Sequence, residues 1–313
     1  MSSAPAVPEA AKAACPLRVV VTGGSGRVGS AVVKRLVAAG HHVINVDRRQ
    51  AKEPVAQRFV YADLRKREQV QPVLEQPDAV CHLGEIPNPD APLGADEIFS
   101  HNTNVAAVVL QTAADLKLRL VVYTSTCQVY GVWGKPPIPP ERLPVDESLP
   151  LRPQNVYALS KVANESYARY VGERHGLGIS IFRLPWVMSE WNDRWYDWFE
   201  KPDGPVPDGL ETYVHAEDAA AAYAAAIERS LPGVEAYHFV AEDVMSVVPL
   251  RERFERHHPT YPKLPTDWPS HRAPVLTTKA REKLGWQPTF NFLDHYAKSR
   301  GRDPRVPSNV RAT

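Results

Sequence analysis

Near the middle of the chain, a tyrosine and a lysine stand four residues apart and have the chemistry of a general base and its activator. They are Tyr157 and Lys161, in the segment NVYALSK. Residues at i and i+4 share one face of a helix, and an ammonium held there lowers the pKa of a phenol from about 10 toward the working pH. The phenolate can then take a proton from a substrate alcohol. Because both residue types are common on surfaces, the spacing indicates catalysis only together with other motifs.

A glycine-rich turn close to the N-terminus is the second such motif. The letters TGGSGRVG, residues 22–29, join a predicted strand at 17–21 to a predicted helix at 30–39. Glycines there allow a tight turn and let a pyrophosphate approach the backbone at the start of the helix, whose free N–H groups favour an anion. The alternative interpretation is a tight structural turn, but the strand–turn–helix context favours a dinucleotide site.

Acidic residues after the next two strands fit an adenosine. Asp47 ends the predicted strand at 42–46, where a carboxylate can accept hydrogen bonds from both ribose hydroxyls, and this favours NAD over NADP. The adjacent Arg48 and Arg49 leave NADP open, because a guanidinium could hold a 2′-phosphate. Asp63 and Leu64 are placed to contact the adenine edge, although Asp63 is equally well placed to be a helix N-cap.

Strands and helices alternate along the chain, which predicts an α/β fold with a Rossmann-type, doubly wound parallel sheet and a small C-terminal substrate-binding cap. Beyond the first two strands and the first helix, further strands are expected at 59–61, 79–83, 120–123, 179–184 and 237–240, and helices at 68–75, 99–115, 157–171 and 218–228. We expect a disordered leader at 1–15, the nucleotide-binding core at 16–185 with 213–240 returning to it, the cap at 186–212 and 241–298, and a tail at 299–313.

Composition excludes several classes of protein. The 313 residues carry a formal net charge of +1, with acids and bases interleaved, which argues against nucleic-acid or membrane-surface partners. No apolar run approaches the roughly 20 residues of a membrane span. Three widely spaced cysteines without a CxxC, and histidines without an HExxH, indicate no disulfide framework and no metal site. We therefore expect a cytoplasmic protein.

Several further segments, in order, resemble the extended short-chain dehydrogenase/reductase family, which is the NAD-dependent epimerase/dehydratase group. TGGSGRVG is similar to its TGGxGxxG turn, VCHLG at 80–84 to its HLAA strand, and TSTCQVYG at 124–131 to its SSSxxVYG. YALSK at 157–161 matches its YxxSK, and YVHAEDAA at 213–220 and LGWQP at 284–288 resemble its later landmarks. The resemblance covers residues 17–288 and implies an enzyme.

The resemblance also implies roles for individual residues. Tyr157 would be the catalytic base, Lys161 its activator, and Thr126 the hydroxyl that bonds the reacting oxygen, with Ser125 as the fallback register. Asn102 would anchor a proton-relay water, with Asn104 as the competing register. We expect cofactor contacts from Gly23, Gly26, Arg27, Val28, Asp47, Arg48, Asp63, Leu64, Leu83, Gly84, Ser125, Tyr157, Lys161 and Pro185, and substrate contacts from Ser125, Thr126, Gln128, Arg183 and Trp186. Family members usually pair the helices near 99–115 and 157–171 across a dimer axis, so a homodimer is expected.

Two departures from the family pattern constrain the reaction. Dehydratases of the family carry acidic residues after the Thr or Ser, whereas this chain has Cys127 and Gln128, which disfavours dehydration. Nucleotide-sugar epimerases usually place a diphosphate-binding arginine two residues before the tyrosine of the YVHAED-like segment, and here that residue is Glu211. A carboxylate facing a diphosphate would repel it, so a smaller sugar-like substrate is favoured, with Arg183, Arg194 and Arg272 available for an anionic group.

Aromatic residues gather just after residue 185. Trp186, Trp191, Trp195 and Trp198, with Tyr196 and Phe199, could stack on a sugar, but the 191, 195, 198 spacing is typical of a packed helix face and favours core packing.

The sequence thus predicts an NAD-dependent dehydrogenase that oxidises a secondary hydroxyl of a sugar or sugar acid. The alternative is a sugar or nucleotide-sugar epimerase with tightly held NAD, and a more distant one is a non-catalytic NAD(P) sensor.

Overall fold

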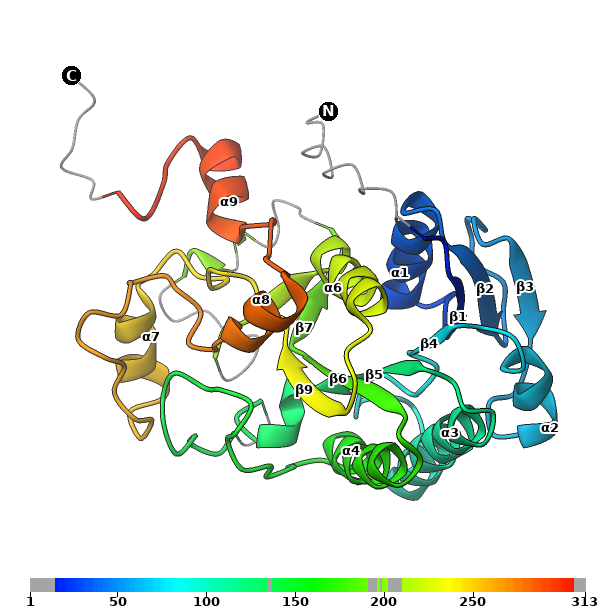
Figure 1. Cartoon of the computed structure of the whole chain (residues 1–313). Helices are drawn as coiled ribbons and strands as arrows, with labels where there is room; N and C mark the ends of the chain where they lie inside the picture. The colour runs from blue at the N-terminus through cyan, green and yellow to red at the C-terminus, as the bar shows by residue number, and fades with distance from the viewer. Residues whose placement is uncertain (1–14, 134–136, 191–195, 198, 202–209, 307–313) are drawn as a thin grey trace.

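The structure, a computed structural model, describes residues 15–133, 137–190, 196–197, 199–201 and 210–306 (Figure 1). Nearly all of the expected leader, the end of the tail, and the side chains of Arg194, Trp191, Trp195 and Trp198 lie outside these residues.

A seven-stranded sheet forms the centre of the molecule, and all of its strand pairs are parallel. Its order is β3-β2-β1-β4-β5-β6-β9. Strands such as β1 (Arg18–Thr22) are rich in valine and buried on both faces, which is typical of a parallel sheet covered by helices. The others are β2 (His42–Asp47), β3 (Arg58–Tyr61), β4 (Ala79–His82), β5 (Leu120–Thr126), β6 (Gly178–Leu184) and β9 (Val234–His238).

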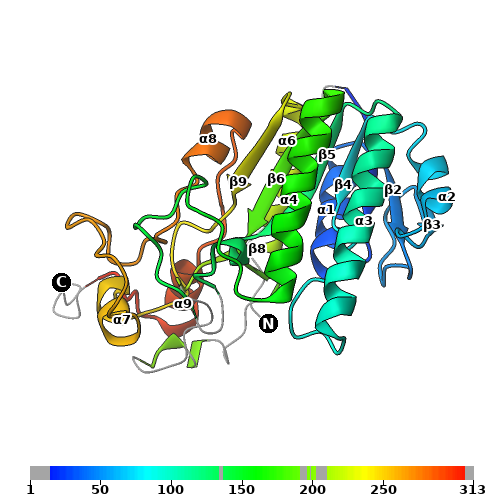
Figure 2. The ribbon, with the colours of Figure 1, turned by 90° about the horizontal axis from the view of Figure 1, so that it is seen from below.

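Helices cover both faces of the sheet, so the predicted doubly wound α/β fold is confirmed. The helices α3 (Ala95–Asp115) and α4 (Val156–His175) lie side by side on one face, as Figure 2 shows. On the other face, α1 (Arg27–Ala38) packs against α6 (Ala216–Arg229). Each face buries its own apolar cluster between helix and sheet.

Element boundaries differ from the expected ones in a few places. The helix predicted at 68–75 is a short α2 (Arg67–Val70) followed by the 3-10 turn η1 (Gln71–Val73), which contains a proline. A second 3-10 turn, η2 (Cys127–Tyr130), follows β5. Two three-residue strands that the sequence did not predict, β7 (Trp186–Met188) and β8 (Tyr213–His215), form a separate parallel pair.

The helices of the C-terminal region pack in different places. α7 (Leu250–His257) belongs to an apolar cluster that also contains residues from 127–149, whereas α8 (Thr278–Leu284) and Trp286 pack on the α1/α6 face of the sheet. Residues 278–286, which we assigned to the cap, therefore pack against the core. The last helix, α9 (Phe292–Arg300), extends into the expected tail.

The carboxyl ends of the parallel strands bring the predicted motifs to one edge. The glycine turn follows β1, Asp47 ends β2, His82 ends β4 and Thr126 ends β5. Open α/β sheets bind ligands at this edge.

Candidate active site

Tyr157 and Lys161 lie at the start of α4, which is fixed by a cap that also contacts η2, the turn after β5. Asn155 is the N-cap, and its Oδ1 accepts a hydrogen bond from the Ala158 N–H at 2.7 Å. The Asn155 Nδ2 in turn donates to Gln128 Oε1 at 2.9 Å. Both Tyr157 and Lys161 are buried, and the Lys161 Nζ lies 5.7 Å from the centre of the Tyr157 ring. The lysine is therefore within electrostatic range of the phenol, as the i, i+4 spacing predicts.

Thr126 and Ser125 point in different directions because successive side chains on a strand alternate between faces. The Ser125 hydroxyl donates to Glu165 Oε1 at 2.6 Å. The Thr126 side chain lies beside Tyr157 and favours the ionised phenol, and its hydroxyl also accepts from the Gln128 N–H. Of the two registers, the structure thus places Thr126 rather than Ser125 next to the candidate base.

The pKa of Tyr157 differs from the sequence-based expectation. Burial raises it above its ordinary value, the charge of Lys161 offsets this only in part, and the carboxylate of Glu85 raises it further. The expectation of a lowered pKa considered the lysine alone and neglected both burial and this carboxylate.

Glu85, which the sequence analysis did not single out, is the nearest acidic neighbour of the lysine. The Lys161 Nζ lies 2.8 Å from Glu85 Oε2 and donates to the Thr124 carbonyl at 2.8 Å. Asn164 also donates to Glu85 Oε2 at 3.2 Å. One feature of the sequence could have identified this residue: a glutamate directly follows VCHLG, where the similar HLAA motif has alanine.

The glycine turn fits a dinucleotide's pyrophosphate by two structural tests. Gly23 has a φ of 70°, and a Cβ there would lie 2.7 Å from the Leu83 backbone and 2.8 Å from the Gly84 Cα, so only glycine lets these chain segments approach so closely. The N-cap of α1, Gly26, makes no side-chain capping bond, and the first turn contains no acidic residue. The first N–H groups of this helix are thus suited to an anion. Val28 lies in that turn, and Arg27 donates to the Val187 carbonyl of β7.

Asp47 lies beside this turn and already accepts backbone hydrogen bonds. Its Oδ2 accepts from the Ser25 N–H at 3.1 Å, and its Oδ1 accepts from Arg48 N–H at 2.7 Å. An ionised carboxylate has about four acceptor positions, so ribose hydroxyls can still bond to it. Arg48 is exposed at the same edge.

Asp63 and Leu64 follow β3 at the expected position. Asp63 forms an ion pair with Arg65 at 2.6 Å, and the hydrogen bond from that guanidinium holds the pKa of Asp63 well below its ordinary value. The N-cap interpretation does not fit, since the residue before α2 is Lys66. Leu64 is buried, and its methyl group lies against Gly84. Contact with an adenine stays a prediction.

Arg183 lies in the protein interior and is not placed to bind an anionic substrate group. Its guanidinium is paired with the Glu165 carboxylate, with Nη2 to Oε2 at 2.6 Å and Nε to Oε1 at 3.0 Å. It also donates to the Tyr130 hydroxyl and to the Glu147 carbonyl. We therefore correct its assignment as a substrate contact. Arg272, the other described candidate, pairs with Glu242 at 3.4 Å.

The remaining predicted residues lie in several environments. Asn102 is fully buried and bonds the Ile86 backbone through both side-chain atoms, while its own carbonyl accepts from Asn164. Its role in a proton relay stays a prediction. Asn104, the competing register, is exposed. Pro185 and Trp186 are half-buried, and Trp186 packs against the cluster that contains Tyr196 and Phe199.

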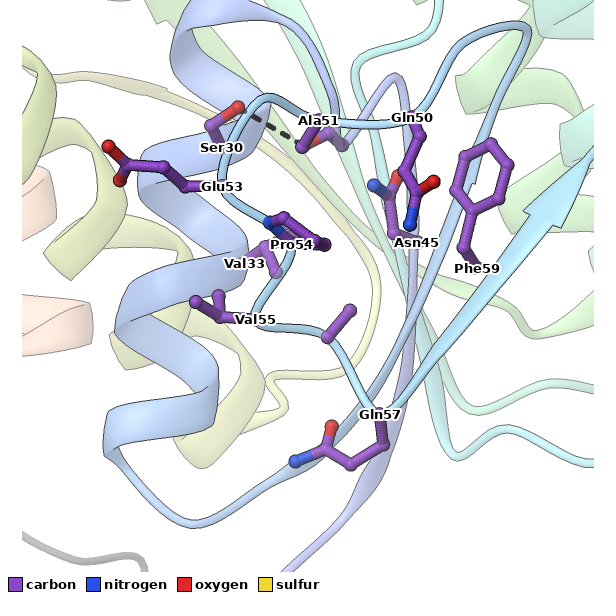
Figure 3. A pocket seen from close by; sticks show the side chains of 12 residues that line it. Ser30, Val33, Asn45, Gln50, Ala51, Glu53, Pro54, Val55, Gln57 and Phe59 are labelled. Atoms are coloured by element: carbon purple, nitrogen blue, oxygen red, sulfur yellow. Dashed lines mark hydrogen bonds between the residues drawn. The ribbon is translucent and has the colours of Figure 1, made fainter.

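A cavity of about 230 Å³ adjoins the glycine turn on its α1 side (Figure 3). Gly24, Ser30, Asn45, residues 50–51 and residues 53–57 contribute to its lining. Tyr157, Lys161 and Thr126 do not line it, so we do not assign it to the reacting end of the substrate.

Two searches of the described residues gave negative findings. Residues 15–133, 137–190 and 210–306, with the few between, contain no group of three His, Cys, Asp or Glu side chains able to hold a metal ion. Over the same part of the chain, no helix is both long and apolar enough to cross a membrane.

Comparisons with known proteins agree with this geometry. Residues 19–198 match the NAD dependent epimerase/dehydratase family. The L-arabinose 1-dehydrogenase (NAD(P)(+)) of Haloferax volcanii is 30% identical over 178 residues, which are 55% of this chain and 68% of that protein. A UDP-glucose 4-epimerase of Azospirillum brasilense is 34% identical over 53% of this chain, but only 48% of that relative is covered. A UDP-glucose 4-epimerase of Streptomyces lividans is 26% identical over 87% of this chain and 92% of its own length.

A solved structure shows the same fold over most of its length. The UDP-glucose 4-epimerase of Bifidobacterium longum, crystallised with NAD+ and UDP, superposes with a TM-score of 0.67 and 22% identity, and covers 90% of this chain and 96% of its own.

A glycine turn and a Tyr–Lys pair at the carboxyl edge of a parallel sheet define a dinucleotide-dependent enzyme of the Rossmann type. The chain belongs to the NAD-dependent epimerase/dehydratase family, the extended short-chain dehydrogenases/reductases.

Proposed function

We propose that this enzyme oxidises a secondary hydroxyl of a sugar or sugar-acid-like substrate, with NAD as the hydride acceptor, and releases the keto product. The observation that carries the proposal is the placement of Tyr157, Lys161 and Thr126 together at the sheet edge that also bears the glycine turn.

The chain's own residues have complementary roles in this reaction. Tyr157, as phenolate, accepts the proton of the substrate hydroxyl, and Thr126 donates a hydrogen bond to the reacting oxygen. Lys161 favours the phenolate through its charge. The bound dinucleotide supplies the hydride acceptor. Because burial excludes water around Tyr157, these electrostatic effects are stronger than they would be at a surface.

The cofactor would be held by residues at the carboxyl ends of β1 to β6. The turn residues Gly23, Gly26, Arg27 and Val28 would contact the pyrophosphate, and Asp47 the adenosine ribose. NAD is favoured over NADP because a 2′-phosphate would meet the Asp47 carboxylate. Arg48 would instead favour NADP, because its guanidinium could hold the 2′-phosphate. Leu83 and Gly84 line the close approach to Gly23, and Asp63, Leu64, Ser125 and Pro185 complete the proposed set.

Glu211 favours a dehydrogenase acting on a small substrate. Its carboxylate is buried and pairs with Arg253 of α7, at 2.6 Å between Oε1 and Nε. It does not face an open site, so our expectation of a repulsive carboxylate needs correction. The position where nucleotide-sugar epimerases carry a cation nevertheless has none, and Arg253 is already bound to Glu211. Neither Glu211 nor Arg253 is therefore expected to bind a diphosphate.

The second candidate is an epimerase that keeps the keto intermediate and its NAD bound. The comparisons support it better than the dehydrogenase, because relatives named UDP-glucose 4-epimerase align over nearly 90% of the chain and solved epimerases share the fold. Both candidates share the first half-reaction, so both need Tyr157.

A substrate panel separates these functions. Free sugars, uronates and nucleotide sugars are incubated with NAD or NADP, and the absorbance of the reduced cofactor is followed. We expect NADH to accumulate with a free sugar or uronate. Interconversion of a nucleotide sugar without accumulated NADH would instead establish the epimerase.

Tyr157→Phe tests whether the protein is an enzyme at all. We expect turnover to fall by a factor of about 100 or more, because the general base is lost, while NAD affinity measured by calorimetry stays close to wild type. Tyr170→Phe, an exposed position on the same helix, is the matched control and should keep full activity. Unchanged turnover in Tyr157→Phe would refute Tyr157 as the base.

A further inference from the structure

A buried carboxylate in contact with the candidate catalytic lysine is the feature that the proposed mechanism leaves unused. Glu85 follows β4, and its side chain is only 3% exposed. Its Oε2 lies 2.8 Å from the Lys161 Nζ, whose side chain is 4% exposed. Buried ions of opposite sign at this distance form a pair whose net charge is zero.

The pair is held from several sides. The Lys161 ammonium has three N–H groups, and Glu85 and the Thr124 carbonyl accept two of them. Glu85 Oε2 also accepts from Asn164, and its Oε1 lies 3.4 Å from His82 Nε2. His82 is bonded through Nδ1 to the Thr22 hydroxyl at the start of the glycine turn. Lys161 thus has little freedom to move relative to the sheet edge.

Other titratable groups near the pair come from every element around it. They are His82 of β4, Tyr123 of β5, His101 of α3, Cys127 of η2, Tyr157 and Glu165 of α4, and Tyr223 of α6. Glu165 is neutralised by Arg183, and the pKa values of Tyr123 and Tyr223 are raised by burial, so both stay neutral. Glu85 is therefore the carboxylate whose charge most directly opposes that of Lys161.

We propose that Glu85 is a positioning residue that holds the Lys161 ammonium beside the phenol and offsets part of the charge with which that ammonium favours the phenolate. With alanine at this place, as in the HLAA motif, the lysine charge would act on Tyr157 without opposition. With Glu85, Tyr157 keeps its proton to a higher pH. This inference rests on the proposed function only in taking Tyr157 as the base.

Two electrostatic effects agree with this arrangement. The charge of Glu85 raises the pKa of Tyr157, in addition to the larger effect of burial. Burial alone would raise the pKa of Glu85, but Lys161 and His82 outweigh it and hold that pKa below its ordinary value. Glu85 is thus charged in the neutral and alkaline range in which Tyr157 would act.

The test removes the charge of Glu85 and keeps the shape of its side chain. Glu85→Gln retains an oxygen that can accept from Lys161, and tyrosine labelled with 13C at Cζ reports the ionisation of Tyr157, with its signal assigned by Tyr157→Phe. The titration runs from pH 8 to 12, with and without saturating NAD. We expect the ratio of phenolate to phenol at a given pH to rise by about tenfold, a shift of about one pH unit. Asp115→Asn, which removes a carboxylate at the far end of α3, should change nothing.

Other outcomes decide against the proposal. An unchanged Tyr157 titration in Glu85→Gln overturns it, and a lower melting temperature without that shift means that Glu85 is purely structural. If Glu85→Gln does not fold, Glu85→Ala is used, with the same expected direction. The titration needs no substrate, so its failure is distinct from failure of the proposed function, which Tyr157→Phe turnover decides.

Discussion

Adjacent side chains on β5 have different partners because a strand directs them to opposite faces. Ser125 bonds Glu165 under α4, whereas Thr126 lies beside Tyr157. In turn, Glu165 accepts from Arg183 on the neighbouring strand. The three residues Ser125, Glu165 and Arg183 form a polar contact between helix and sheet, one layer behind the reacting groups. Arg183 therefore supports the site without taking part in binding.

Replacing Arg183 should destabilise the fold and leave substrate selectivity unchanged. Arg183→Met would leave the Glu165 carboxylate buried without its partner, which costs about 3–5 kcal/mol. Denaturant unfolding measures this loss. Arg142→Met is the control, because Arg142 makes a half-exposed ion pair with Asp146 and should cost no more than about 1 kcal/mol. Normal stability in Arg183→Met together with a raised KM for anionic substrates would restore Arg183 as a substrate contact.

At the scale of elements, the β1–α1 turn uses its glycines for two separate purposes. Gly29 packs helix against turn: a Cβ there would lie 2.1 Å from the Gly23 carbonyl oxygen and 2.8 Å from the Gly24 Cα. At Gly26 a Cβ would meet only the Gly23 oxygen, at 3.2 Å. Gly29 is thus demanded by the fold, whereas a methyl group at Gly26 would require the Gly23 oxygen to shift by only a few tenths of an ångström.

This difference gives a paired prediction. Gly29→Ala should lower the melting temperature, because the backbone of the turn must shift to admit the methyl group. Gly26→Ala should melt close to wild type but bind NAD at least tenfold more weakly, because its methyl group would occupy the approach to the helix N-terminus. Scanning calorimetry and titration calorimetry measure the two effects. Equal NAD affinity in Gly26→Ala and wild type would show that the pyrophosphate binds elsewhere.

The sequence predicted the helices and strands that depend on residues close together in the chain. It did not predict contacts between residues that are far apart in the chain. Tyr157 and Lys161 share a helix face by spacing alone, and valine-rich runs identified the central strands. Glu85 stands far from Lys161 in the sequence, and no pattern links the two residues until β4 and α4 are placed together. Arg183 was assigned to the substrate for the same reason, because its partner Glu165 lies on α4 and is not close to it in the sequence. β7 and β8 were missed because three residues carry no periodic signal.

At the scale of the whole molecule, one carboxylate ties the C-terminal region to the core. Asp218 of α6 accepts hydrogen bonds from the Thr289 N–H at 2.9 Å, the Thr289 hydroxyl at 2.7 Å and the Phe290 N–H at 2.9 Å. The indole of Trp286 donates to the Asp218 carbonyl. Two sequence landmarks, YVHAEDAA and LGWQP, are therefore parts of one contact.

The expected homodimer stays a prediction at this scale. Leu159 and Tyr170 of α4 are exposed where the dimer would form.

Removing the Asp218 carboxylate should loosen that attachment. Asp218→Ala leaves three donors without their acceptor and should cost about 2–4 kcal/mol. Thermal unfolding, with limited proteolysis after residue 286, measures the loss. Glu217→Ala, the neighbouring position on the same helix, should have little effect. Equal protease resistance in Asp218→Ala and wild type would contradict this assignment.

The Glu211–Arg253 pair has a consequence for how the enzyme's specificity can evolve. Glu211 adopts a left-handed φ of 55°, which is uncommon for this residue type and is held by its contacts. Substituting arginine at 211 alone would bury two guanidinium groups against each other, and substituting Arg253 alone would leave Glu211 buried without a counter-ion. Either single step is expected to impair folding. A change of specificity between small sugars and ligands that carry a diphosphate would therefore require residues 211 and 253 to change together. In a combinatorial library of these two positions, the effects of the single substitutions should be strongly non-additive.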